Sequence, residues 1–249
     1  MVRLIPDPRD LVWGSTRTEP WFRNPERKRI GEVWYPTETL LLKYLFTEEN
    51  LSVQVHPGDA YAAVHHKGSP GKTEMWHILR ADEGAQIAVG LRHTVTIDEL
   101  AAAALDGSIV DLLRWIPVKP GENYFIPAGT IHAIGGGIAL FEIQQRSEIT
   151  YRLYDWGRGR ELHLDHALAV ASRQPFDALR DLPVKCEYFI TEKAGPVVQG
   201  PCVLATTEGA GDVWLVEGIS GFSRVGLKIS RPPNATLLVA APLGTELRG

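Results

Sequence analysis

The chain lacks the features of disulfide-rich and membrane-spanning proteins. It has only two cysteines in 249 residues. These are Cys186 and Cys202, and no histidine lies near them, which favours reduced core thiols over a disulfide framework or a zinc knuckle. No apolar run approaches the roughly 20 residues of a membrane helix, and the N-terminus lacks the charged-then-apolar order of a signal peptide. We therefore expect a cytoplasmic protein that does not bind membranes.

Neither sign of charge dominates the sequence. Lys and Arg total 26 against 30 for Asp and Glu, so the net field offers no general attraction to nucleic acid. A few local cations would have to hold any anionic ligand. The apolar fraction of 44% and the charged fraction of 22% are typical of globular domains. The oligomeric state, monomer or homodimer, stays open.

Short apolar, β-branched or aromatic runs separated by Gly, Pro, Asp and Asn predict a mainly β sandwich or barrel. In the first part of the chain they cover residues 39–46, 51–56, 74–79, 85–91, 123–126 and 138–144. In the second part they cover 188–190, 202–206, 213–217, 222–229 and 236–240. Two helices are expected, over 97–105 with a capping box of Thr96 and Glu99, and over 164–172 as a bridge between two barrels.

The histidines divide the chain into two unequal parts. All 8 of them precede residue 167, so a metal site belongs to the first part. We predict a metal-binding catalytic domain over residues 1–175 and a smaller half over 185–249, with the boundary between 175 and 185 near Pro175 and Pro183. The second half is expected to serve packing, a lid or a dimer surface.

Gln54 and His56 form the first candidate ligand pair. They are two residues apart in the strand-like run 52–56, so their side chains share one face of the strand, while Val53 and Val55 face the other way. A Gln carbonyl and an imidazole together suit a borderline divalent ion such as zinc, manganese or iron.

The run Gly-Glu-Asn-Tyr-Phe-Ile-Pro-Ala-Gly-Thr-Ile-His over 121–132 carries a more specific pattern. A strand ends at Ile126, Pro127 and Gly129 form a turn, and His132 re-enters the sheet facing inward. This spacing resembles the second motif of the cupin superfamily. The resemblance implies a cupin, or jelly-roll, β-barrel with His132 as a metal ligand.

Glu74 supplies an anionic ligand. It opens an apolar strand, where an unpaired carboxylate facing the interior would be costly and coordination would offset that cost. Gln54, His56, Glu74 and His132 together leave a divalent ion with net positive charge and room for a water or substrate oxygen.

Five further segments extend the resemblance over roughly residues 10–175. They are Val-Trp-Gly at 12–14, Ile-Gly-Glu-Val-Trp at 30–34, Leu-Ser-Val-Gln-Val-His-Pro at 51–57, Gly-Lys-Thr-Glu-Met-Trp at 71–76 and Thr-Tyr-Arg-Leu-Tyr-Asp at 150–155. In this order they are similar to the short form of the type I mannose-6-phosphate isomerases. The resemblance implies a zinc-dependent enzyme that interconverts mannose 6-phosphate and fructose 6-phosphate. It also implies a functional arginine at Arg152 and a functional lysine at Lys72, and it is faint in the second, degenerate cupin-like barrel.

Four polar residues are candidates for the chemistry of an aldose–ketose conversion through an enediolate. Arg152 would stabilise the enediolate, because its planar guanidinium matches paired oxygens. Lys72 should point into the same cavity as Glu74 and either contact phosphate or shuttle a proton. Glu142 is either the base or half of a structural ion pair, and Ser52 either donates to phosphate or is an ordinary strand serine.

Two other functions remain open. The chain could be a cupin enzyme of another class, such as a dioxygenase, because the barrel supports many chemistries. It could also be a sugar-phosphate-binding cupin without turnover. Lys72 and Arg152 argue against a dioxygenase, since that chemistry needs no phosphate clamp.

Overall fold

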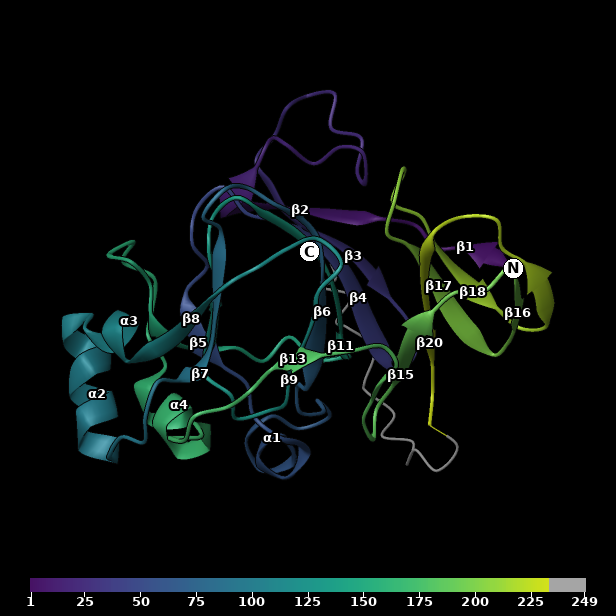
Figure 1. Cartoon of the computed structure of the whole chain (residues 1–249). Coiled ribbons are helices and arrows are strands. Elements are labelled where there is room, and N and C mark those ends of the chain that lie inside the picture. Colours follow the sequence, from purple (N-terminus) through teal and green to yellow (C-terminus); the bar gives the residue numbers. More distant parts are fainter. Residues whose placement is uncertain (233–249) are drawn as a thin grey trace, which may run out of the picture.

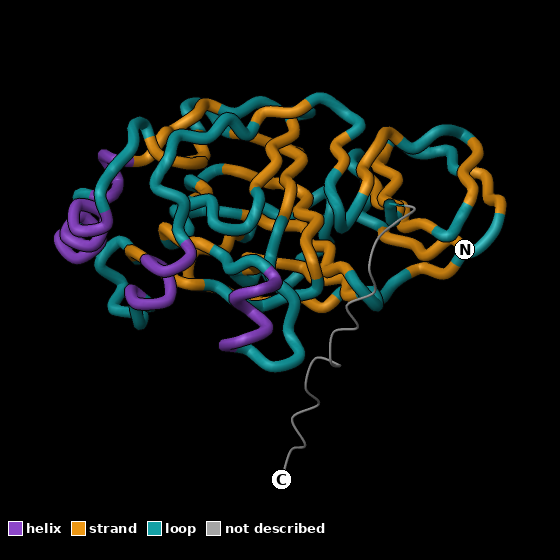
Figure 2. The backbone as a smooth tube through the Cα atoms, turned by 90° about the horizontal axis from the view of Figure 1, so that it is seen from below, coloured by secondary structure: helices purple, strands orange, loops and turns teal. Residues whose placement is uncertain are grey.

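The computed structural model describes residues 1–232. Figure 1 shows a barrel of facing sheets, with helices packed on its outer side, and a smaller lobe of strands on the opposite side. The view from below in Figure 2 shows the same two parts side by side.

Two antiparallel sheets build the barrel. The larger sheet has the order β13-β9-β6-β11-β4-β3-β2. Its strands are β2 (Asp7–Ser15), β3 (Ile30–Pro36), β4 (Leu40–Phe46), β6 (Glu74–Ala81), β9 (Asn123–Ile126), β11 (Ile138–Gln145) and β13 (Leu179–Arg180). The smaller sheet has the order β12-β5-β10-β7-β8. Its strands are β5 (Val53–Val55), β7 (Gln86–Leu91), β8 (Leu113–Pro117), β10 (His132–Ile134) and β12 (Tyr151–Tyr154). The predicted mainly β architecture is confirmed.

The helices lie outside the barrel. They are α1 (Asp59–His65), α2 (Ile97–Asp106), α3 (Ile109–Leu112) and α4 (Leu164–Val170). The predicted capping box of α2 is present, and Gly107 ends this helix with a left-handed φ of 86°. α4 packs against α2 and β12 on the five-stranded sheet, so the expected bridge between two barrels is wrong. Within residues 1–232, no helix is long and apolar enough to span a bilayer.

The second lobe is a six-stranded antiparallel sheet with the order β1-β18-β17-β20-β15-β14, next to a two-stranded ribbon, β16 with β19. Its strands are β1 (Val2–Arg3), β14 (Val184–Lys185), β15 (Ile190–Lys193), β16 (Val197–Gln199), β17 (Cys202–Thr206), β18 (Val213–Val216), β19 (Ile219–Gly221) and β20 (Gly226–Ser230). The strand predicted at 236–240 lies outside the described residues. Both cysteines are free thiols, as expected.

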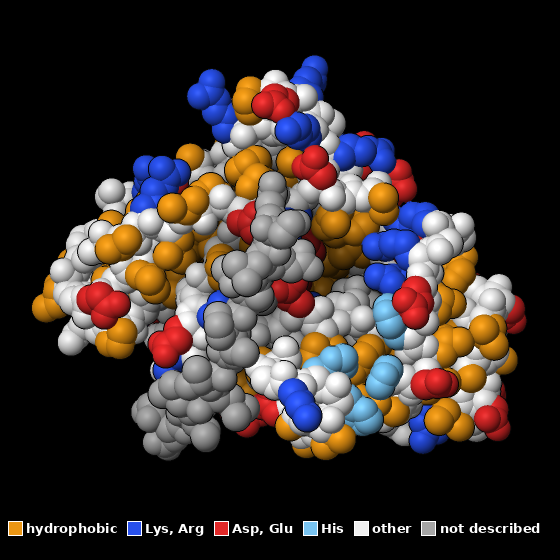
Figure 3. Space-filling model, turned by 180° about the vertical axis from the view of Figure 1, so that it is seen from behind, with side chains coloured by type: hydrophobic (Ala, Val, Ile, Leu, Met, Phe, Trp, Pro, Cys, Tyr) orange, Lys and Arg blue, Asp and Glu red, His pale blue; other side chains and the backbone are white. Residues whose placement is uncertain are grey.

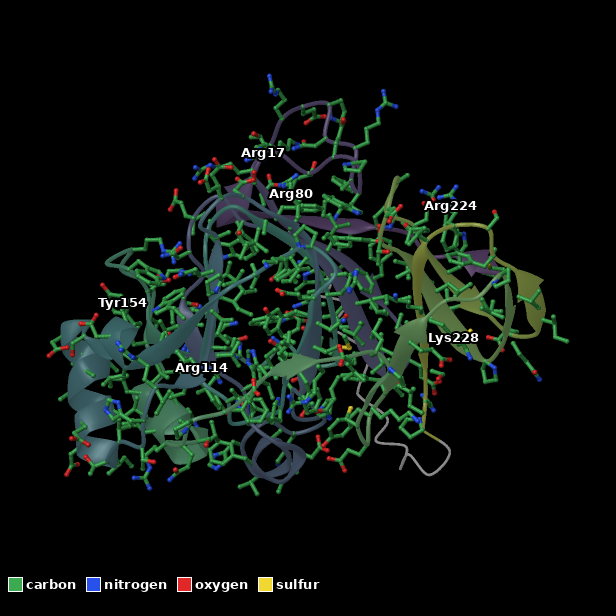
Figure 4. All side chains as sticks on the ribbon, viewed as in Figure 1. Arg17, Arg80, Arg114, Tyr154, Arg224 and Lys228 are labelled. Carbon is green, nitrogen blue, oxygen red and sulfur yellow. The ribbon has the colours of Figure 1, made fainter. Side chains whose placement is uncertain are left out.

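An apolar core joins the lobe to the seven-stranded sheet. Phe189 of the lobe belongs to the same buried cluster as Leu42 and Phe141 of the barrel. Tyr44 donates a hydrogen bond to the Thr206 carbonyl at 2.6 Å across this contact. The exposed rims carry ion pairs instead. Figure 4 shows Arg17 and Arg80 together at one end of the barrel, and Arg224 and Lys228 on the lobe.

Candidate metal centre and substrate pocket

The candidate metal ligands come from both sheets of the barrel. His132 opens β10 and pairs with Gln54 of β5, so two predicted ligands are neighbours across one ladder. Val53 and Val55 are fully buried on the opposite face of β5, in the core beneath the helices. The alternation predicted for this strand is therefore present.

Glu74 reaches the two histidines from the opposing sheet. It opens β6 and pairs with Ile126 at the end of β9, just before the turn that leads to His132. Its Oε2 lies 3.5 Å from His56 Nε2, and its Oε1 lies 3.4 Å from His132 Nε2. The three side chains are almost completely buried, and one ligand atom from each lies within 4.8 Å of the others. Among residues 1–232, this is the group of His, Cys, Asp and Glu that could hold a metal ion.

Backbone carbonyls orient both imidazoles toward Glu74. His56 Nδ1 donates to the Ile149 carbonyl at 2.9 Å, and His132 Nδ1 donates to the Thr130 carbonyl at 2.9 Å. Each Nε2 therefore keeps its lone pair and faces the carboxylate, as a ligand nitrogen must.

Glu74 also has room for a cation at one of its oxygens. Its Oε2 forms an ion pair with Lys72 Nζ at 3.0 Å, whereas no hydrogen-bond donor reaches its Oε1 in the described part of the chain. A fully buried carboxylate oxygen without a partner is costly. A metal ion between it and the two Nε2 atoms would remove that cost, so the residues fit the predicted group.

Burial sets the protonation states of the triad. Burial and the charge of Glu142 raise the pKa of Glu74 to about 7, against the opposing effect of Lys72. Burial lowers the pKa of His132 to about 4, although the Thr130 carbonyl opposes the shift. Burial and the charge of Lys72 lower the pKa of His56 as well. Both histidines are therefore neutral near pH 7, and a bound cation would favour the ionised form of Glu74.

Gln54 and Lys72 lie directly beside the triad. Gln54 Nε2 is 3.2 Å from His132 Nε2, and the Ser52 hydroxyl donates to Gln54 Oε1 at 3.3 Å. A half-turn of the amide would bring its oxygen toward the histidine nitrogen. Lys72 Nζ lies 2.9 Å from His56 Nε2 and 3.0 Å from Glu74 Oε2.

A pocket of about 330 Å³ lies over these residues. Ser52, Gln54, Lys72, Glu142 and Arg152 all line it, so the structure brings together every polar residue predicted for substrate or catalysis. The remaining lining side chains are Leu11, Trp13, Glu32, Trp34, Lys43, Leu45, Leu51, Glu148, Thr150 and Arg160.

Glu142 is held in an ion pair that the sequence left as one of two alternatives. Its Oε1 lies 3.1 Å from Lys43 Nζ, and its Oε2 accepts from Trp76 Nε1 at 3.0 Å. Burial alone would raise its pKa, but the charges of Lys43 and Lys72 and these hydrogen bonds bring the pKa below its usual value. Glu142 is thus an ionised carboxylate that also faces the pocket.

Sequence reasoning missed Lys43. It lies in the middle of β4, directly across from Glu142 of β11, and within 3.7 Å of Glu32. The signal was a single charge inside the apolar run 40–46, where every residue is buried. Its partner lies so far along the chain that only the strand order reveals the pair.

Two arginines border the pocket from the β12 side. Arg152 Nη1 donates to the Glu161 carbonyl at 2.6 Å. Arg160 binds the buried Asp155 through two hydrogen bonds, at 2.8 Å from Nε and 2.6 Å from Nη2. Arg160 lines the pocket beside Arg152.

The other histidines lie apart from the triad. His65, His66, His163 and His166 surround Tyr61 and Tyr151, with His66 Nε2 2.6 Å from the Tyr151 hydroxyl and His166 Nδ1 2.9 Å from the Tyr61 hydroxyl. Figure 3 shows histidine side chains gathered on one face. His77 bonds to Asn123 Oδ1 at 2.8 Å and does not line the pocket.

A two-sheet β-barrel with a buried His-Glu-His group under a polar pocket defines a protein of the metal-binding cupin type. No family model matches the chain. It is 38% identical over 198 residues to the mannose-6-phosphate isomerase ManA of Bacillus subtilis, covering 72% of this chain and 62% of that protein. It is 45% identical over 150 residues to the mannose-6-phosphate isomerase of Streptococcus mutans, covering 58% of this chain and 47% of that protein.

Solved structures with a similar fold carry the same kind of name as these relatives. The crystal structure of the mannose 6-phosphate isomerase from Bacillus subtilis superposes with a TM-score of 0.76 at 25% identity, covering 92% of this chain and 98% of that chain. A putative mannosephosphate isomerase from Archaeoglobus fulgidus shares the fold, with a TM-score of 0.71 at 16% identity over 92% of this chain and 96% of that chain. By sequence and fold, the chain is a homologue of the mannose-6-phosphate isomerases. The sequence matches span about half to three-fifths of the length of these curated relatives.

Proposed function

We propose that the protein is a metal-dependent isomerase that interconverts mannose 6-phosphate and fructose 6-phosphate. The observation that carries this proposal is the convergence of His56, Glu74 and His132 beneath a pocket lined by Lys72 and Arg152. A sugar phosphate needs both features, because its oxygens bind a Lewis acid and its phosphate binds cations. The names of the relatives supply the particular sugar.

The metal would be one divalent ion, and zinc suits the donor set best. Two imidazole nitrogens, one carboxylate oxygen and the Gln54 oxygen would fill a tetrahedral shell, so a substrate oxygen would enter as a fifth ligand. When bound, the ion would supply a Lewis acid for the hydroxyl or carbonyl oxygens of the sugar.

The chain's own residues would handle the proton and the charge. Glu142 is ionised and faces the pocket, so we assign it as the base that carries the proton between C2 and C1 of the sugar. Arg152 would stabilise the negative charge of the enediolate through its guanidinium. Lys72 and Ser52 would bind the substrate, because both line the pocket. A metal ion bound to His56 Nε2 would displace the Lys72 ammonium from that atom, and Lys72 would then be free to contact the substrate.

The two parts of the chain would have different roles. Residues 1–175 would carry the catalytic chemistry, and residues 185–249 would support them as the degenerate cupin-like half. Phosphorylated hexoses are charged and cross bilayers poorly, so we place the enzyme in the cytoplasm, with no role for nucleic acid or membrane.

The assay that tests this function follows mannose 6-phosphate formed from fructose 6-phosphate, alongside other hexose and pentose phosphates. We expect turnover that a chelator abolishes and zinc restores. His132→Ala should lose bound metal by elemental analysis and at least about 100-fold in kcat/KM, since it removes a ligand rather than a supporting contact. His77→Ala is the matched control and should keep its metal, because His77 lies on β6 outside the pocket.

Four outcomes would contradict the proposal. Full activity in metal-free protein would exclude the metal role. Retention of a full equivalent of metal by His132→Ala would exclude the ligand assignment. Tight binding of the sugar phosphate without turnover would favour the binding module, and turnover of a substrate other than a sugar phosphate would favour another cupin enzyme.

A further inference from the structure

A short segment, Gly71–Thr73, ends the connection from α1 to β6, the strand that Glu74 opens. It carries Lys72 and runs directly into Glu74. The position of this segment therefore decides how Glu74 faces His56 and His132 across the barrel.

One carboxylate outside the metal centre holds this segment. Asp59, the first residue of α1, accepts from the Gly71 backbone N–H at 2.7 Å and from Gln145 Nε2 at 2.9 Å, both through Oδ1. Its Oδ2 accepts from the Tyr188 hydroxyl at 2.9 Å. Three donors from three distant parts of the chain therefore converge on a single side chain, and bonds to a charged acceptor are stronger than neutral ones.

Gln145 holds the other side of the segment, and together with Asp59 it forms what we call the clamp. The Gln145 Oε1 accepts from the Thr73 backbone N–H at 2.8 Å, and the Gln145 backbone N–H donates to the Thr73 carbonyl at 3.1 Å. The Lys72 backbone N–H donates to the Pro57 carbonyl at 2.9 Å. Every residue of the segment is thus fixed through its backbone.

The approach between Asp59 and the segment is close enough to require glycine. A Cβ on Gly71 would lie 2.5 Å from the Asp59 backbone nitrogen. No side chain fits there without moving α1 or the segment that leads to Glu74.

Tyr188 connects the clamp to the second lobe. It lies between β14 and β15 and packs against the core cluster shared by the lobe and the barrel. The contact from its hydroxyl to Asp59 is a polar link from the lobe to the segment between the two ligand strands.

We propose that Asp59 and Tyr188 are positioning residues for the metal centre, and that through them the second lobe controls how tightly the metal is held. Neither residue belongs to the triad or lines the pocket. They act through Gly71 and Gln145, which fix the carboxylate ligand relative to the histidines. The kinetic consequence rests on the proposed isomerase function, whereas the effect on metal binding does not.

The test compares Tyr188→Phe and Asp59→Asn with the unsubstituted protein. The metal dissociation constant is measured by zinc competition against a chromophoric chelator, and folding by the thermal unfolding midpoint. We expect Tyr188→Phe to weaken zinc binding by roughly three- to tenfold, as the loss of one hydrogen bond to a carboxylate predicts. Asp59→Asn should weaken it by roughly 10- to 100-fold, and the double variant should add little because both changes break the same link.

The matched control is Tyr35→Phe. The Tyr35 hydroxyl donates to the Gly211 carbonyl of the same lobe at 3.2 Å but touches no residue of the 71–73 segment. Its removal should leave zinc affinity unchanged.

Two results would overturn the proposal. One is wild-type zinc affinity in Tyr188→Phe. The other is an equal loss of affinity in Tyr188→Phe and Tyr35→Phe, which would reflect general destabilisation. If the wild-type protein lacks isomerase activity but Tyr188→Phe still releases zinc more readily, the proposed function fails and the positioning role stands.

Discussion

Glu74 and Glu142 are two buried carboxylates on neighbouring strands with opposite environments. Glu74 pairs with Lys72, yet its pKa rises to about 7, because burial and the charge of Glu142 outweigh the nearby lysines. Glu142 has Lys43 and Trp76 as partners, and they bring its pKa below the usual value although burial opposes this. Environments that separate two carboxylates suit one as a metal ligand and the other as an ionised proton acceptor.

The buried pair of Lys43 and Glu142 gives a prediction about stability. Lys43→Met leaves Glu142 as an unpaired buried charge, so the free energy of unfolding of the metal-free protein should fall by about 3–5 kcal/mol. Lys43→Met with Glu142→Gln should regain a large part of this, because the orphaned charge is gone. Urea denaturation measures all three proteins. A single variant as stable as the wild type would show that the pair contributes nothing.

Residues that local spacing fixes were predicted from the sequence, and residues that depend on strand order were not. His56 and Gln54 follow from a period of two, and His132 follows from the proline and glycine of the preceding turn. Lys43 was missed because its neighbours in the pocket come from other strands. The roles assigned to the pocket residues remain predictions until the variants are measured.

At the scale of single elements, local sequence alone specifies both ends of α2, through the capping box at its start and Gly107 at its end. Thr96 Oγ1 accepts from the Glu99 backbone N–H at 3.2 Å, and Glu99 Oε2 accepts from the Thr96 backbone N–H at 2.7 Å. Thr96→Ala should lower the free energy of unfolding by about 1 kcal/mol. Zinc affinity should not change, because α2 lies outside the barrel, away from the pocket. A change in zinc affinity would contradict that separation.

Other elements lack such a signal. β2 was not predicted because its first four residues are exposed and polar or proline, so no alternation appears. α1 was not predicted either, because it has only seven residues and no side-chain cap. These elements form because the barrel and the Asp59 contacts support them.

At the scale of the whole molecule, the shared core predicts one cooperative unfolding transition. Phe189 is fully buried among side chains from both parts. Phe189→Ala should cost about 3–5 kcal/mol and lower the unfolding temperature of barrel and lobe together. Calorimetry checks this by comparing the calorimetric with the van't Hoff enthalpy. Two separate transitions would mean that the parts fold independently.

The first strand of the chain is built into the last sheet. β1 pairs with β18, where Val2 faces Leu215 across the ladder, and Arg3 forms an ion pair with Asp212. The N-terminus therefore emerges from the lobe, opposite the helices (Figure 1). A purification tag fused there would lie away from the pocket. A tag that displaced β1 would expose the unpaired backbone groups of β18, which could then pair with a strand from another copy of the chain.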